Sequence, residues 1–80
     1  MEQIPVKSSN VGYIAYDASN RELHLAFHDR IVDLPWEGCR KYKYFDVDAE
    51  TFEELKAAES KGSYVYLNIA FEYKYTSYQA

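Results

Sequence analysis

The sequence predicts an α+β fold, in which a small antiparallel β-sheet of about four strands carries one α-helix packed on it. Apolar residues alternate with period two in several separate segments, which indicates half-buried strands. A single segment, from Asp48 to Lys61, carries the charges and boundary residues of a helix. A chain of 80 residues provides one domain, which we expect to span residues 1–80.

The composition excludes some classes of protein. The chain is 48% hydrophobic and 18% aromatic, which is typical of a globular domain and not of a disordered one. Its net charge of −4 excludes the broad basic surface of a general nucleic-acid binder. So small a domain buries little more than about 60% of the surface of its unfolded chain. We therefore expect a homo-oligomer, because a second subunit would cover apolar surface that the monomer leaves in water.

The chain carries no sign of a secreted or membrane protein. Cys39 is the only cysteine, so the fold does not depend on an internal disulfide. The segment MEQIPVKSSN has neither the basic nor the apolar region of a signal peptide. No apolar run approaches the roughly 18 residues of a membrane span. We expect a cytoplasmic protein that makes no contact with a membrane.

Strands are expected in the first half of the chain. Residues 1–9 form a flexible lead, and NVGYIAYD forms a strand that ends at the turn residues DASN. The clearest half-buried strand is RELHLAFH, whose two faces are Leu23, Leu25 and Phe27, and Glu22, His24, Ala26 and His28. Residues 28–40 are expected to be an expanded loop anchored by Trp36, because Pro35 and Gly38 break any strand pairing there. The segment KYKYFDV then returns to a strand.

A helix is expected from Asp48, which can cap its start, to Lys61, a cation near its negative end. Gly62 is placed to take the left-handed conformation that follows many helices. Beyond Gly62, residues 64–75 alternate with period two, which favours a strand. A short helical turn from Tyr64 to Ile69, followed by a strand, fits almost as well, and both alternatives stay open.

Two stretches, VKSSNVGYIAYD and YFDVDAETFEELKAAESKGSYVYLNI, resemble the KTSC domain family. Its small domains stand alone or lie at the C-terminus of some lysyl-tRNA synthetases, and the match covers roughly residues 5–75, with AAESKGSY as its most specific part. The matching positions are Ser8, Ser9, Asn10, Tyr16, Tyr42, Tyr44, Phe45, Asp46, Val47, Ser60, Lys61, Gly62, Ser63, Tyr64, Asn68 and Ile69. The family has no established activity, and its link with a synthetase hints at RNA or nucleotide contact.

This chain departs from the family pattern near the Asn68–Ile69 pair. The family usually has basic residues there, whereas this chain has Tyr66, Leu67, Ala70 and Phe71. Apolar and aromatic groups in place of cations disfavour contact with an RNA backbone. They favour a buried contact, either with a second subunit or with a flat-ringed ligand.

No catalytic or metal-binding motif is found. His24 and His28 on one strand lie about 13 Å apart at roughly 3.3 Å per residue, too far to share an ion, and are expected to face solvent. Cys39 has no supporting third residue for a nucleophile and is expected to be a small buried apolar group. Asp46 and Asp48 are best explained by the start of the helix. We expect a non-enzymatic protein that has no cofactor.

Two segments are candidates for binding a ligand. In RKYKY, rings and cations interleave, which suits a phosphate with a stacked base, although a solvated edge strand would show the same pattern. In SKGSY, the backbone amides after Gly62 could form an anion-binding nest, although a helix C-cap needs only the glycine. The predicted ligand-binding residues are Arg40, Lys41, Tyr42, Lys43, Tyr44, Lys61, Ser63, Tyr64 and Tyr66.

The tyrosines after Gly62 exceed what so small a core needs, and tyrosine is enriched where surfaces meet. The predicted interface residues are Trp36, Tyr66, Phe71, Tyr73 and Tyr75. The leading hypothesis is a non-enzymatic protein that self-associates and captures a nucleotide-like or phosphate-bearing ligand, as a phage or accessory factor that sequesters a signal molecule would. The alternatives are an adaptor or inhibitor that docks on a host enzyme, and an RNA- or tRNA-contacting module, which the net charge disfavours.

Overall fold

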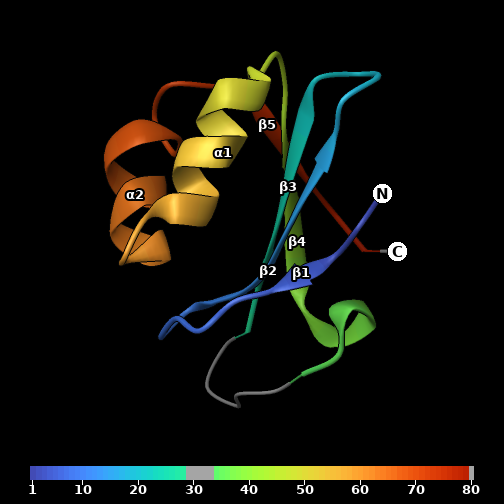
Figure 1. Cartoon of the computed structure of the whole chain (residues 1–80). Helices are drawn as coiled ribbons and strands as arrows, with labels where there is room; N and C mark the ends of the chain where they lie inside the picture. The colour runs from blue at the N-terminus through green and yellow to red at the C-terminus, as the bar shows by residue number, and fades with distance from the viewer. Residues whose placement is uncertain (29–33, 80) are drawn as a thin grey trace.

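The computed structural model describes residues 1–28 and 34–79, and within them it shows a five-stranded antiparallel sheet with two α-helices on one face (Figure 1). The α+β class is confirmed, but the expected four strands are five and the expected single helix is two. The strands are β1 (Ile4–Pro5), β2 (Val11–Asp17), β3 (Glu22–Phe27), β4 (Arg40–Tyr44) and β5 (Tyr75–Tyr78), and the helices are α1 (Ala49–Ala57) and α2 (Lys61–Asn68). The strands lie in the sheet in the order of the sequence.

The β2–β3 hairpin forms where the turn residues DASN predict it. The Asp17 carboxylate accepts hydrogen bonds from the backbone N–H of Ser19 at 3.1 Å and from the Asn20 amide at 2.9 Å, which fixes the turn locally. Arg21 follows with a positive φ of 55°. The lead expected to be flexible contributes β1, since Ile4 pairs with Ile14 of β2.

Strand β3 is buried on both faces, and the expectation of solvent-facing histidines is therefore wrong. His24 is 7% exposed and His28 is 6% exposed. The period-two pattern is present, but the second face of the sheet is also covered. A 3-10 turn, Trp36–Gly38, brings Trp36 against Ala26, and Cys39 packs there as the small buried group that was expected.

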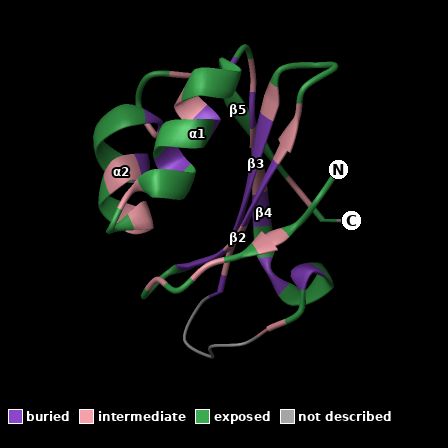
Figure 2. Cartoon of the chain, viewed as in Figure 1, coloured by how far each residue is buried: buried purple, intermediate pink, exposed green. Residues whose placement is uncertain are grey.

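Two apolar clusters lie on the two faces of the sheet. The cluster on the helix side contains Leu23, Leu25 and Tyr44 from the strands with Leu55 and Ile69 from the helical layer. The opposite cluster, formed by Ala15, Ala26, Trp36 and Cys39, is smaller. Figure 2 shows the resulting pattern, in which the outer sides of both helices are exposed while strands β3 and β4 are mostly covered.

The segment expected to be one helix from Asp48 to Lys61 is broken at residues 58–60, and the expected C-cap at Gly62 is wrong. Ala58 is extended, with φ −67° and ψ 137°, and ends α1. Ser60 then begins α2, because its hydroxyl accepts a hydrogen bond from the Ser63 N–H at 3.2 Å. No described glycine has a positive φ. The alternative of a helical segment followed by a strand is therefore the correct one.

Asp48 occupies the N-cap position of α1, although its side chain makes no capping hydrogen bond and pairs instead with Arg21. The loop expected at residues 28–40 is described only in part, because residues 29–33 lie outside the described residues. Among the described residues, no helix has the length and apolar character needed to cross a membrane.

Candidate ligand-binding site

A polar hollow lies where the loop between β1 and β2 meets the first turn of α2. It has a volume of about 520 Å³. Residues 7–10 line one side, residues 59–63 line the other, and Tyr66 and Leu67 of α2 complete it. These segments are about fifty residues apart in the sequence, so the hollow exists only in the folded chain.

Gly62 allows the two sides of the hollow to approach each other closely. A Cβ atom at Gly62 would lie 2.9 Å from Oδ1 of Asn10 and 3.6 Å from Oγ of Ser8. The Ser8 hydroxyl donates to Asn10 Oδ1 at 3.2 Å and accepts from the Val11 N–H at 3.3 Å, which holds the loop in place. The glycine therefore serves close packing of backbone against a side chain, and not a left-handed turn.

Positive charge gathers around this hollow in an otherwise acidic protein. The ammonium of Lys61 donates to the backbone carbonyls of Lys56 at 3.0 Å and Ala58 at 2.6 Å, where α1 ends. Lys7, on the opposite side, has no ion-pair partner among the described residues. Glu59 supplies one carboxylate to the lining, so two lysines and one glutamate leave one net positive charge. The first N–H groups of α2 add a partial positive charge.

Exposed rings lie beside the polar groups. Tyr66 is 64% exposed and Phe71 is 79% exposed, and their rings meet edge to face with centroids 5.6 Å apart. Leu67, which is 70% exposed, lies next to Tyr66 in the chain. A ring beside a cationic hollow can stack on a nucleobase while the cations hold a phosphate.

Tyr64, also predicted to bind a ligand, has a structural role instead. Its hydroxyl donates to Oε1 of Glu54 at 2.7 Å and ties α2 to α1. Burial and the hydrogen bond with the Glu54 carboxylate raise the pKa of Tyr64 to about 12. Its ring packs against the core on the helix side and is not available for stacking.

Lys41 and Tyr44, which were both predicted to bind a ligand, are buried. Lys41 is 1% exposed, and its ammonium donates to the backbone carbonyls of Trp36 and Cys39, each at 3.0 Å. Tyr44 is 5% exposed in the core on the helix side, where burial raises the pKa of its hydroxyl. Tyr42 and Tyr44 lie toward the helices, and Lys41 lies on the opposite side of the sheet.

The two predicted ligand-binding segments therefore do not form one site. Arg40, Tyr42 and Lys41 line a second hollow of about 300 Å³ together with residues 77–79 of the last strand and its end. Lys43 lies over the ring of Tyr78, at 5.9 Å from the centroid. Only Lys61, Ser63 and Tyr66 of the predicted set line the larger polar hollow.

The predicted interface residues divide in the same way. Trp36 is 8% exposed and packs edge to face on Tyr13. The prediction that Trp36 lies in an interface is therefore wrong. Tyr73 is half-buried against the core on the helix side. Tyr66, Phe71 and Tyr75 are exposed, the last at 55%.

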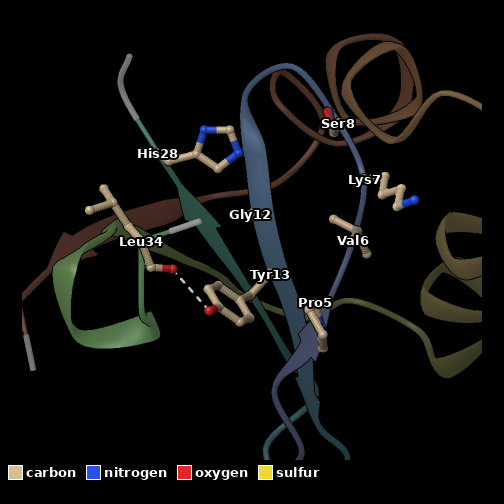
Figure 3. A pocket seen from close by; sticks show the side chains of 8 residues that line it. All are labelled: Pro5, Val6, Lys7, Ser8, Gly12, Tyr13, His28 and Leu34. Carbon is tan, nitrogen blue, oxygen red and sulfur yellow. Dashed lines mark hydrogen bonds between the residues drawn. The ribbon is translucent and has the colours of Figure 1, made fainter. Parts of the chain in front are cut away.

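A third cavity, of about 330 Å³, lies between β1, β2 and the end of β3 (Figure 3). The Tyr13 hydroxyl donates to the Leu34 carbonyl at 2.9 Å along one side of it. His28 lies beside Gly12, where a Cβ would be 3.0 Å from the imidazole Cδ2. The side chain of Lys7 points away from His28 in Figure 3, so the polar groups do not converge on one ligand position. No group of three metal-ligating side chains is found among the described residues.

Sequence reasoning missed the contribution of residues 7–10 to the polar hollow. The available signal was the Ser8-Ser9-Asn10 stretch, which matched the family pattern but was not assigned to a site. The structure places it against the other specific stretch, residues 60–64. The pair of the buried His24 and the half-buried Tyr78 was also missed, since neither residue has a local pattern that predicts it.

The fold defines the class of this protein: a small α+β domain with a sequential antiparallel sheet and two helices on one face. The model of the KTSC domain matches residues 7–73, so the chain belongs to the KTSC domain family. The crystal structure of a KTSC domain protein from Yersinia pestis is similar with a TM-score of 0.81 and 25% sequence identity, over 96% of both chains. A Tsukamurella paurometabola sequence named only "Protein" is 34% identical over 61 residues, which is 76% of this chain and 78% of that protein.

Proposed function

We propose that this protein is a non-enzymatic binding protein that captures a phosphate-bearing, nucleotide-like ligand in the polar hollow and that self-associates. One observation carries the proposal: residues 7–10 meet the first turn of α2 beside the exposed ring of Tyr66. Hydroxyls, two ammonium groups and the first amides of a helix are the donors that phosphate groups accept in proteins.

The charge of the hollow limits which ligand fits. One net positive side-chain charge, together with the helix N-terminus, matches a single phosphate better than a polyphosphate. A base stacked on an aromatic ring contributes roughly 1–3 kcal/mol, and Tyr66 and Phe71 offer the rings. The cytoplasmic location and a role as a phage or accessory factor that sequesters a signal molecule stay predictions.

The test is thermal unfolding with a panel of nucleoside monophosphates, cyclic nucleotides and inorganic phosphate. A bound ligand should raise Tm by several degrees, since 1 kcal/mol shifts Tm of such a domain by roughly 4–8 °C. Lys7→Ala and Tyr66→Leu should abolish the rise, whereas Lys74→Ala, an exposed lysine that does not line the hollow, should leave it unchanged. If no compound of the panel raises Tm, the proposal is ruled out.

A second candidate function is an adaptor or inhibitor that docks on another protein. The exposed side chains of Tyr66, Leu67 and Phe71 favour it, because exposed apolar groups that adjoin often mark a protein contact. Trp36 does not support it, because that side chain is buried. The RNA alternative requires binding that weakens steeply with salt, and a hollow with one net positive charge gives a shallow salt dependence.

A further inference from the structure

We propose that the outer edge of β5 pairs antiparallel with the same strand of a second copy, joining two sheets across a two-fold axis at Thr76. This specifies the self-association in the proposed function and does not depend on ligand binding. β5 is the last strand in the sheet order, so one of its edges pairs with β4. The other edge has no strand beside it within the described residues. In Figure 1 the helices lie over the opposite part of the molecule from the C-terminal end of β5.

The hydrogen-bonding groups that face this outer edge follow from the ladder with β4. The Phe45 N–H donates to the Lys74 carbonyl at 2.9 Å, so these two residues form a hydrogen-bonded pair. Antiparallel ladders alternate hydrogen-bonded and non-hydrogen-bonded pairs. The pairs of Tyr75 with Tyr44 and of Ser77 with Tyr42 are therefore non-hydrogen-bonded pairs. Tyr75 and Ser77 consequently direct their N–H and C=O groups away from β4.

The two edges of the sheet differ in their protection against pairing. Strand β1 has two residues, and one of them, Pro5, has no N–H to donate. Strand β5, with the sequence Tyr75-Thr76-Ser77-Tyr78, contains no proline and no charged residue. Its register with β4 is regular over all four pairs. Short strands, prolines, charges and bulges are the usual devices that protect an edge, and β5 has only its shortness.

A second copy fits this edge because the edge is complementary to itself. An axis at Thr76 places Tyr75 opposite Ser77 of the second copy, and Ser77 opposite Tyr75 of that copy. Each of these two pairs would exchange two backbone hydrogen bonds. The four side chains are uncharged, so no like charges come to lie opposite one another within the strand pair.

The same arrangement brings the Tyr75 side chains of the two copies close together. Tyr75 lies on the helix side of the sheet, with its ring centroid 5.7 Å from Tyr42 and 5.5 Å from Tyr44. With the axis at Thr76, the helix sides of both sheets face the same way, and the two copies of Tyr75 become diagonal neighbours. Diagonal positions across strands are within reach of aromatic side chains. The contact is small, so the dimer should dissociate on dilution.

The first test measures sedimentation of the full chain across a range of concentrations. The wild type should change from monomer to dimer as the concentration rises. Ser77→Pro should stay monomeric, because proline removes an N–H that faces the outer edge and spares the bonds to β4. Glu2→Pro, an exposed residue outside the strands, is the matched control and should dimerise as the wild type does.

Hydrogen exchange provides a second test, which does not depend on a variant. The amides of Tyr75 and Ser77 should exchange more slowly as the concentration rises, whereas those of Thr76 and Tyr78, which face β4, should be protected throughout. A monomer at every concentration would overturn the inference, and a strand from another protein would then be the occupant of the edge. A dimer that Ser77→Pro leaves intact and Phe71→Ala disrupts would overturn it as well. Neither result affects the thermal shift with nucleotides, so the two proposals fail independently.

Discussion

The hydroxyl of Tyr78 lies 2.6 Å from Nδ1 of His24, which connects the last strand of the sheet to the central one across β4. The two rings also meet edge to face, with centroids 5.6 Å apart. His24 is 7% exposed, and burial lowers the pKa of its imidazole; the carboxylate of Glu22 opposes this shift, and the charge of Lys43 adds to it. The neutral imidazole is therefore the form that the folded chain favours.

This pair predicts that the free energy of unfolding falls as the solution becomes mildly acidic. The pKa of His24 in the folded chain lies below its ordinary value of 6.5, so the unfolded chain binds a proton first as the pH falls. Stability should be constant above that value and decrease between it and the lower folded-state pKa. Urea unfolding at pH 7.5 and at pH values below 6.5 measures the effect. His24→Gln should flatten the profile, and an unchanged slope in that variant would assign the effect to other groups.

The hydroxyl of Tyr78 should contribute measurably to stability. Tyr78→Phe leaves the ring in place but removes the partner of a buried imidazole nitrogen. An unpaired buried polar atom costs roughly 1–3 kcal/mol, and we expect a loss of that size in urea unfolding at neutral pH. Tyr66→Phe removes a hydroxyl for which no hydrogen bond to a described residue is found, on an exposed side chain, and should change stability by less than about 0.5 kcal/mol. Equal losses in the two variants would contradict the role of the pair.

The period-two pattern was sufficient to locate β3, but it could not reveal that both faces of the strand are buried. Alternation assigns histidine and lysine to the solvent side, but here Trp36 lies over Lys41 and Tyr78 packs on His24. These contacts depend on the course of residues 34–39 and on the pairing of β5 with β4, and the strand's own sequence indicates neither. The burial of His24 and Lys41 was therefore not predictable from their own strands.

The break between α1 and α2 was missed because the same residues suit two structures. Lys61 near a negative helix end and Gly62 after it match the end of one helix. The chain instead uses Ser60 to begin a second helix, while Lys61 still binds the carbonyls at the end of the first. Of the predicted ligand-binding residues, Lys61 and Ser63 line the hollow, but its other side, residues 7–10, comes from tertiary packing alone.

Lys41, one of the residues predicted to bind a ligand, should instead affect stability. Its ammonium satisfies the backbone carbonyls of Trp36 and Cys39 beneath the Trp36 ring, which lies 5.7 Å from it. Lys41→Met fills the same space but leaves the carbonyls unpaired, so we expect a loss of roughly 1–3 kcal/mol in urea unfolding. Lys43→Met, on the same strand but only half-buried, should cost less than about 0.5 kcal/mol. A Lys41→Met protein as stable as the wild type would show that this ammonium is not required in the core.

The close approach of Asn10 to Gly62 predicts that Gly62→Ala changes the free energy of unfolding in opposite directions with and without the Asn10 side chain. Alanine in a helix is favoured over glycine by roughly 0.5–1 kcal/mol, so Gly62→Ala would stabilise a free α2. In this fold the new Cβ would lie 2.9 Å from Asn10 Oδ1, which the Ser8 hydroxyl holds in place, so we expect a net loss of about 1 kcal/mol. In an Asn10→Ala background the obstruction is gone, and Gly62→Ala should become stabilising by roughly 0.5–1 kcal/mol. Urea unfolding of the four proteins in this cycle measures the coupling, and additive effects would mean that α2 does not lie against Asn10 in solution.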